Sequence, residues 1–187
     1  MADRPTGQVI PSREVYSPED RTREFLFDKK LDAEMDRIDR KILDLLQQNG
    51  TLSVADIGHR VGLSQTPCWK RIQRLEAEGV IQRRVALLDP DKLGLGLTVF
   101  VCIEVGDHTQ EAINRFIDAI ATMNEVVEFH RMAGDVDYIL RVVVSDVKAY
   151  DLFYKRLIGI VPLKNVCSRF SVERVKFTTA LPIETTA

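Results

Sequence analysis

The segment LSQTPCWKRIQRLEAEGVI, at residues 63–81, constrains the fold of this chain more than any other stretch. Cys68, Ile72 and Leu75 follow one another at spacings of four and three residues, which places them on one stripe of a helix. Polar, aromatic and basic side chains occupy the opposite side. A helix with two such faces buries its apolar stripe against other helices and presents the other side to solvent or to a partner.

Two more helices are predicted directly upstream of this segment. In the first, apolar side chains recur at helical spacing before Gly50: Met35, Ile38, Ile42, Leu45 and Leu46. The second, SVADIGHRV, begins at Ser53 as its N-cap and ends at Gly62. Its predicted inner face consists of Ala55, Ile57 and Val61. A short helix, a glycine-containing turn and a second helix form the helix-turn-helix pattern.

The second helix of this motif enters the major groove of DNA with its N-terminal residues toward the base edges. Glutamine pairs with adenine, lysine with guanine, and threonine contacts a thymine methyl, whereas flanking arginines suit phosphates. The predicted DNA-binding residues are Ser64, Gln65, Thr66, Trp69, Lys70, Arg71 and Arg74. Two alternatives stay open: Trp69 packs against the first helix or the linker, and the basic residues form only a solvated face.

The charge distribution favours a nucleic-acid partner for this part of the chain. The whole sequence has a formal net charge of −2, but residues 35–84 carry nine Lys and Arg against six Asp and Glu. Residues 85–187 carry eleven against fourteen. Because binding to phosphates depends on basic side chains, only the first of these two segments is suited to contact double-stranded DNA.

The hydrophobic period changes in the second half of the chain. Residues 80–90, VIQRRVALLDP, are predicted to form a strand that acts first as a wing-like arm and then as a linker. Beyond it, the patterns follow the order β-α-β-β-α-β, which is the ferredoxin-like arrangement and makes the chain α+β. The predicted elements are strands 97–105, 125–134, 136–145 and 165–177, and helices 109–123 and 147–158.

The three cysteines, Cys68, Cys102 and Cys167, are widely spaced and form no metal-binding pattern. We interpret them as buried free thiols and expect neither a metal nor a cofactor. The sequence has no signal-peptide pattern and no run of about 18 apolar residues that could span a membrane. Together with the free thiols, this predicts a cytoplasmic protein without a membrane partner.

Three segments carry a resemblance to a known family: MDRIDRKILDLLQQNG, VGLSQTPCWKRIQRLEAEGVI, and AGDVDYILRV followed by an aromatic helix. In these segments the chain resembles the Lrp/AsnC regulators, also called feast/famine regulators. The segments TPCWKR, RMAGDVDY and FTTALPI look most like the DecR-type, cysteine-responsive branch.

The resemblance implies a plain or winged helix-turn-helix domain followed by a RAM domain (regulation of amino acid metabolism). RAM domains of the family dimerise through their sheets, the dimers commonly assemble into octamers, and an amino acid binds between RAM domains. The expected parts are a charged, partly disordered extension (1–34), a DNA-binding domain (35–84), a linker (85–96), a RAM domain (97–180) and a tail (181–187).

The turn in RMAGDVDYILR is the best candidate for a ligand site in the second half. Gly134 can adopt positive φ and expose backbone N–H groups to a carboxylate, and Asp135 and Asp137 can hold an ammonium group. The alternative is a plain Gly-Asp hairpin turn whose carboxylates face water. The resemblance carries the effector role to Met132, Gly134, Asp135, Asp137 and Tyr138. Asp137 and Tyr138 project to opposite faces of a strand, so at most one of them is expected to face a shared ligand.

These observations predict a homo-oligomeric transcription regulator that responds to a small amino acid, with L-cysteine as the first candidate and leucine or another amino acid as the second. One alternative is an enzyme, because the same two-domain architecture resembles sirohaem decarboxylases, with His130 or Tyr138 as proton donor. The sequence has no recognisable catalytic constellation, so we expect no enzymatic activity. The other alternative is a DNA-architectural protein without an effector.

Overall fold

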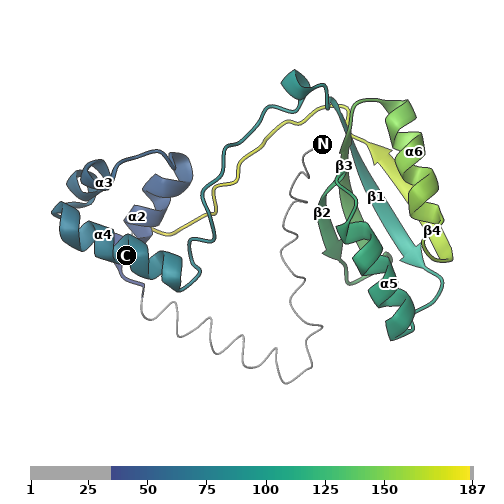
Figure 1. Cartoon of the computed structure of the whole chain (residues 1–187), viewed down its shortest axis with the longest axis horizontal. Coiled ribbons are helices and arrows are strands. Elements are labelled where there is room, and N and C mark those ends of the chain that lie inside the picture. The colour runs from purple at the N-terminus through teal and green to yellow at the C-terminus, as the bar shows by residue number, and fades with distance from the viewer. Residues whose placement is uncertain (1–34, 186–187) are drawn as a thin grey trace, which may run out of the picture. The chain divides into compact units, whose positions relative to one another are not determined.

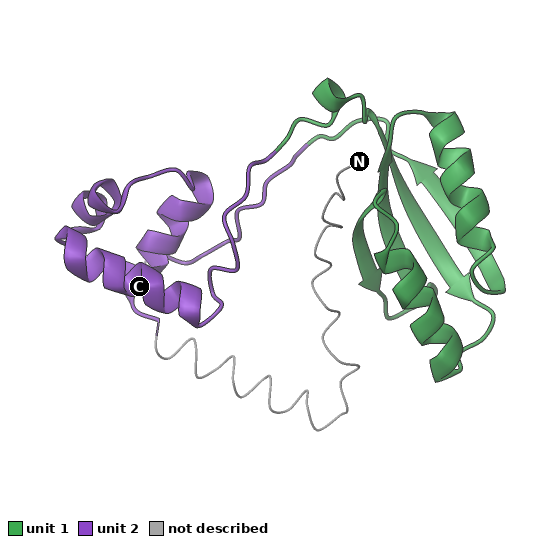
Figure 2. Ribbon diagram, in the orientation of Figure 1, with its two compact units in different colours: residues 1–12, 88–175 green, residues 13–87, 176–187 purple. Residues whose placement is uncertain are grey.

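The computed structural model describes residues 35–185 and divides them into two compact units (Figure 2). One unit contains residues 88–175, and the other contains residues 35–87 together with 176–185. The predicted extension at residues 1–34 lies outside the described residues.

The smaller unit is built from three helices: α2 (Arg37–Gln48), α3 (Val54–Val61) and α4 (Gln65–Ala77). They enclose a core in which every member is at least 98% buried: Ile42, Ile57, Cys68, Ile72 and Leu75. Three of these residues are the stripe that the spacing in α4 predicts. The apolar period therefore fixes which side of α4 faces the other two helices.

Short polar side chains start the helices, as N-caps generally do. Asp36 caps α2, and its Oδ1 accepts hydrogen bonds from the N–H groups of Ile38 and Asp39 at 2.8 and 2.9 Å. Ser53 caps α3 and accepts from the N–H of Asp56 at 3.1 Å. Ser64 is the N-cap of α4, but its side chain makes no capping hydrogen bond.

The inner face of α3 differs from the predicted one. Ala55 is exposed, and the buried side consists of Ile57 and Gly58, with Val54 and Val61 partly buried. Counted from Val54, the other three positions lie three, four and seven residues along the helix, as residues on one helix face do. Ala55 lies outside this series. Gly58 is required because a Cβ there would lie 2.8 Å from the carbonyl oxygen of Leu63 in the turn.

The predicted strand over residues 80–90 is wrong. Within residues 35–185, the structure assigns no strand between Glu78 and Gly96, and its only regular element there is a 3-10 turn, η1 (Asp91–Leu93). A strand needs a neighbour to satisfy its backbone N–H and C=O groups, and this segment pairs with none in the described part of the chain. Among the described residues, the helix-turn-helix unit therefore has no wing.

The larger unit has the predicted β-α-β-β-α-β order. Its elements are β1 (Leu97–Val105), α5 (Gln110–Ala121), β2 (Val126–Arg131), β3 (Tyr138–Val144), α6 (Val147–Ile158) and β4 (Leu163–Phe170). The strands form an antiparallel sheet in the order β2-β3-β1-β4. Phe116 of α5 and Phe153 of α6 belong to one core with Val101 of β1, so both helices cover the same face of the sheet (Figure 1).

Strand β4 ends earlier than predicted. The N–H of Ser171 still donates to the carbonyl oxygen of Thr98 at 2.9 Å. Because β1 begins at Leu97, the residues that follow Ser171 run past the end of β1 and have no strand beside them there. Val172, which lies within the predicted strand 165–177, is therefore fully exposed.

Neither of the helices described in this unit, α5 and α6, covers the second face of the sheet. Phe100 of β1 lies opposite Arg141 of β3 and Arg169 of β4, and Cys102 lies opposite Cys167. We call these five residues the open face. Phe100 is 40% exposed there, which leaves an aromatic ring in contact with solvent near the middle of a sheet. Cys167, predicted to be buried, is exposed because it points to this face rather than to the helices.

Candidate nucleic-acid interface and effector loop

The start of α4 presents most of the predicted DNA-binding residues to solvent. Ser64, Gln65, Thr66 and Lys70 are exposed, and Trp69 is 50% exposed. These side chains lie on the side of α4 opposite its buried stripe. A helix start with accessible amide, hydroxyl, aromatic and ammonium groups has the composition that reads base edges in a major groove.

Arg71 and Arg74 have a different role from the rest of the predicted set. Asp39 of α2 is completely buried, and its carboxylate accepts hydrogen bonds from Arg71 Nη1 at 2.9 Å and from Arg74 Nη2. Arg71 also bonds Asp36 Oδ2 at 2.7 Å. The structure thus turns the guanidinium of Arg71 toward α2 rather than outward, whereas Arg74, with 43% of its side chain exposed, keeps a solvent-facing part.

This ion-pair network is electrostatically strong. The hydrogen bonds that Arg71 donates to Asp39 and then to Asp36 raise the pKa of Arg71 above its ordinary value. Burial raises the pKa of Asp36, but hydrogen bonds from the backbone of Asp39 and the side chain of Arg71 outweigh it and lower that pKa overall. Buried charges are tolerated when they are paired and hydrogen-bonded. Asp39 therefore fixes α4 on α2 and so sets the orientation of the exposed residues.

Asp36 and Asp39 are functional positions that the sequence prediction missed. Their spacing, an acidic residue three positions after an acidic N-cap, is a capping-box signal that can be recognised in the sequence. The side chain of Asp39 does bond the N–H of Asp36, at 3.2 Å. Its pairing with arginines more than 30 residues away carries no local signal.

The predicted effector loop connects β2 to β3. Gly134 has φ 133°, a conformation that side-chain-bearing residues rarely adopt. The N–H of Met132 donates to the carbonyl oxygen of Asp137 at 2.8 Å and closes the loop. Met132, Gly134 and Asp135 are all exposed, so the loop presents backbone and a carboxylate to solvent, as a site for a zwitterion requires.

Asp137 and Tyr138 are used within the fold. Asp137 donates its N–H to the carbonyl oxygen of Ile103 at 2.9 Å, and its Oδ2 accepts from the N–H of Val105 at 2.8 Å. Tyr138 is 2% exposed, its ring lies 5.3 Å from that of Phe116, and burial raises the pKa of its hydroxyl. The structure therefore places the ring of Tyr138 in the core, away from the loop surface.

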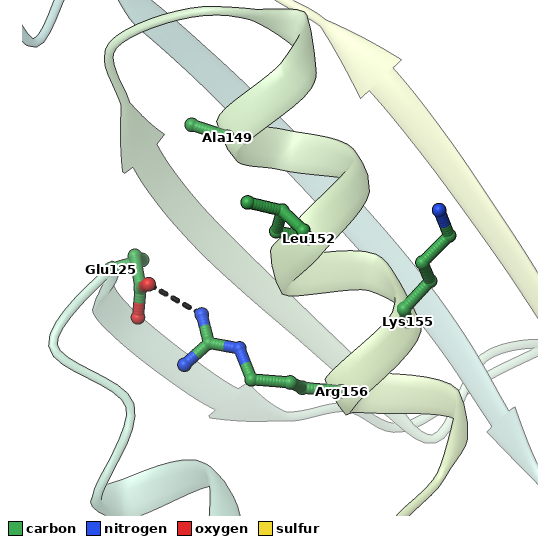
Figure 3. Close-up of a pocket in the computed structure, with 5 residues that line it drawn as sticks. All are labelled: Glu125, Ala149, Leu152, Lys155 and Arg156. Atoms are coloured by element: carbon green, nitrogen blue, oxygen red, sulfur yellow. Dashed lines mark hydrogen bonds and ion pairs between the residues drawn. The ribbon is translucent and has the colours of Figure 1, made fainter.

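A separate depression of about 600 Å³ lies along α6 (Figure 3). It is lined by Glu125, Ala149, Leu152, Lys155 and Arg156, and an ion pair of 2.5 Å joins Arg156 to Glu125. None of the predicted effector residues lines it. Within residues 35–185, no group of three or more His, Cys, Asp or Glu side chains is arranged to hold a metal ion, and no helix is long and apolar enough to cross a membrane.

Two family patterns together match most of the described chain. The AsnC-type helix-turn-helix domain matches residues 35–76, and the Lrp/AsnC ligand binding domain matches residues 98–181. The "DNA-binding transcriptional activator DecR" of Escherichia coli (strain K12) is 53% identical over 151 residues, which cover 80% of this chain and 99% of that protein.

Solved structures agree with this match. An AsnC family transcriptional regulator from Agrobacterium tumefaciens is 56% identical, with a TM-score of 0.77 over 79% of this chain and 97% of that chain. A transcriptional regulator from Neisseria meningitidis, solved as a complex with L-Met, is 32% identical, with a TM-score of 0.75 over 79% of this chain and 96% of that chain.

A helix-turn-helix with an accessible second helix, joined to a ferredoxin-like ligand-binding domain, defines a DNA-binding transcription regulator. The chain belongs to the Lrp/AsnC family. Because its close relatives are named as transcription regulators, the chain is a regulator and not an enzyme, and the decarboxylase alternative is set aside.

Proposed function

We propose that this regulator controls genes of amino acid metabolism and changes its DNA binding when a small amino acid occupies the loop at Gly134. The observation that carries the proposal is the accessible start of α4, which the buried Asp39 holds in a fixed orientation. A regulator that binds chromosomal DNA acts in the cytoplasm, so we place it there.

On DNA, we assign base reading to Gln65, Thr66 and Lys70, with Trp69 stacking on sugars or base edges. Ser64 begins the helix beside the phosphate backbone. Arg74 contributes its exposed part to a phosphate, whereas Arg71 positions α4 from behind. This division follows from exposure: the base-reading residues face solvent, but Arg71 has only 28% of its side chain exposed.

For the effector, backbone N–H groups around Gly134 would hold the carboxylate, and Asp135 would pair with the ammonium group. Met132, 40% exposed, offers apolar contact to a side chain of the ligand. L-Cysteine is the first candidate because of the similarity to DecR. The L-Met complex of the Neisseria meningitidis relative supports a small amino acid more generally.

We further propose that the chain works as a homodimer that assembles into a larger oligomer, with an octamer as the expected state. The open face supports this, because an apolar ring such as Phe100 in the middle of an uncovered sheet favours burial against a second copy. Effector binding between RAM domains would then alter assembly together with DNA affinity.

Replacing Lys70 with Ala tests the DNA-binding surface. We expect weaker binding to the operator and a salt slope that falls by about 1 if Lys70 reaches a phosphate, or relaxed preference at one base pair if it reads guanine. Fluorescence anisotropy over a series of salt concentrations measures both. Arg115→Ala in α5 is the control, because Arg115 lies in the sheet unit and forms an ion pair with Glu111 on its own helix. Binding by Lys70→Ala that equals the control in affinity and salt slope would remove α4 from the interface.

A further inference from the structure

The exposed face of α4 continues one turn beyond Trp69, to Gln73. Gln65, Trp69 and Gln73 follow one another at intervals of four residues, which places them on one side of the helix. At about 1.5 Å of rise per residue, Gln65 and Gln73 lie about 12 Å apart along the helix axis. Recognition helices contact bases over about two turns, so Gln73 lies within the length of α4 that can reach into a major groove.

A neighbouring carboxylate holds the amide of Gln73. Gln73 Nε2 donates a hydrogen bond to Glu76 Oε2 at 2.9 Å. A side-chain amide has two N–H donors and an oxygen that accepts two hydrogen bonds, so one N–H group and Oε1 stay available beside this bond. A glutamine uses these two groups when it binds N6 and N7 of adenine in the major groove. The contact with Glu76 therefore does not consume the groups that bind adenine.

Glu76 is fixed in turn by the segment that follows α4. Arg84 Nη2 donates to Glu76 Oε1 at 3.1 Å, so the two carboxylate oxygens bind different partners. The guanidinium also balances a negative charge that would otherwise lie on the side of α4 turned toward phosphates. A side chain that is held in its bound orientation loses less entropy on binding than a mobile one. Gln73, Glu76 and Arg84 thus form a chain of contacts that presents one amide in a fixed direction.

We propose that Gln73 reads an adenine in the major groove and is a further specificity-determining residue of this regulator, with Glu76 and Arg84 as positioning residues. The inference rests on the proposed DNA binding by α4. It adds a base contact two turns beyond that of Gln65, and it gives the segment after α4 a part in sequence recognition.

The test lets the whole protein select binding sites from a pool of randomised DNA, and fluorescence anisotropy then measures the Kd for the selected site and its single-base variants. We expect Gln73→Ala to lose its preference at one A·T base pair and to bind the selected site roughly 5–150-fold more weakly, the value of one bidentate base contact. Its salt slope should not change, because a base contact neutralises no phosphate. Gln73→Lys should prefer G·C at the same base pair, since lysine pairs with guanine.

Gln110→Ala in α5 is the matched control. Gln110 is an exposed helical glutamine of the sheet unit, and its Nε2 donates to Asn114 Oδ1, four residues further on. This variant should select the same site as the native protein and bind it with the same Kd.

The same readout tests the positioning residues. Glu76→Ala should weaken the preference at the base pair that Gln73 reads and leave the preferences at the other base pairs. Glu76→Gln should recover part of it, because its amide oxygen can still accept the bond from Gln73. Arg84→Ala should weaken the same preference, whereas a purely structural role would lower the affinity for all sequences alike.

Identical selected sites for the native protein and Gln73→Ala would overturn the inference and leave the proposed DNA binding intact. A loss of affinity by Gln73→Ala that is equal for every base variant would do the same. A native protein that selects no site would contradict the proposed function itself, and this inference with it. Because Gln73 is exposed and alanine favours helices, we expect Gln73→Ala to fold; should it not, the base preference of Gln73→Lys decides.

Discussion

At the scale of single residues, Asp39 connects two helices of the DNA-binding unit. It is a completely buried carboxylate that receives hydrogen bonds from Arg71 and Arg74, so it links the first helix to the recognition helix. The sequence suggested both arginines as phosphate contacts because they lie on a basic helix. In the structure both arginines bond Asp39, which lies 32 and 35 residues away, and a contact between distant residues leaves no mark in helical spacing.

We predict that Asp39→Asn lowers the free energy of unfolding by about 1.5–3 kcal/mol, because two guanidinium groups lose charge-assisted hydrogen bonds to a buried acceptor. Urea denaturation measures this loss. Asp44→Asn is the matched control on the same helix. Within residues 35–185, its carboxylate bonds the nearby side chains of Gln47 and Gln48, so we expect a change within about 0.5 kcal/mol. Equal losses in the two variants would show that Asp39 has no special structural role.

At the scale of elements, local signals predict helix and strand positions well where a period and a cap coincide. Strand 97–105 and helix 147–158 have the predicted bounds, and Thr109 and Asp146 act as the N-caps of α5 and α6. The predicted strand over residues 80–90 is wrong because apolar and β-branched residues show only that a segment can be extended. Whether an extended segment becomes a strand depends on a partner, and β4 stops at Phe170 for the same reason.

The turn of the helix-turn-helix depends on Gly58. A Cβ at this position would lie 2.8 Å from the backbone carbonyl oxygen of Leu63. We therefore expect Gly58→Ala to lower the free energy of unfolding by about 1–3 kcal/mol through overpacking. In Gly50→Ala the nearest atom to the new Cβ is 3.8 Å away, so thermal or urea unfolding should change little. Comparable stability of both variants would contradict the close approach at Gly58.

At the scale of the whole chain, the helix-turn-helix unit contains two segments that are far apart in the sequence. Gln47 donates from Nε2 to the carbonyl oxygen of Leu181 at 2.9 Å, and the N–H of Leu181 donates to Gln47 Oε1 at the same distance. The chain therefore returns to α2 after the sheet domain. The sequence suggested only a short tail here, because a glutamine on a helix gives no indication of a backbone partner 134 residues later.

Hydrogen exchange at the amide of Leu181 tests this return of the chain. In the native protein, exchange at Leu181 should be slower than at Glu184. Gln47→Ala should accelerate it at Leu181, since the amide loses its acceptor. Gln48→Ala removes the neighbouring glutamine, whose Nε2 donates to Asp44, and should leave the exchange rate at Leu181 unchanged. Equal exchange rates at Leu181 in all three proteins would mean that the tail does not dock on α2 in solution.

The central claim is that amino acid binding at the loop changes DNA binding by α4. The most direct measurement is fluorescence anisotropy of labelled DNA from upstream of the regulator's own gene, titrated with the whole protein with and without L-cysteine. We predict sequence-specific binding whose Kd shifts by about 5–150-fold, the usual range of allosteric coupling. Asp135→Ala should bind the same DNA but lose the shift. A shift with methionine or leucine instead would change only the identity of the effector. Weak binding without sequence preference, erased by salt and unaltered by any amino acid, would contradict the account.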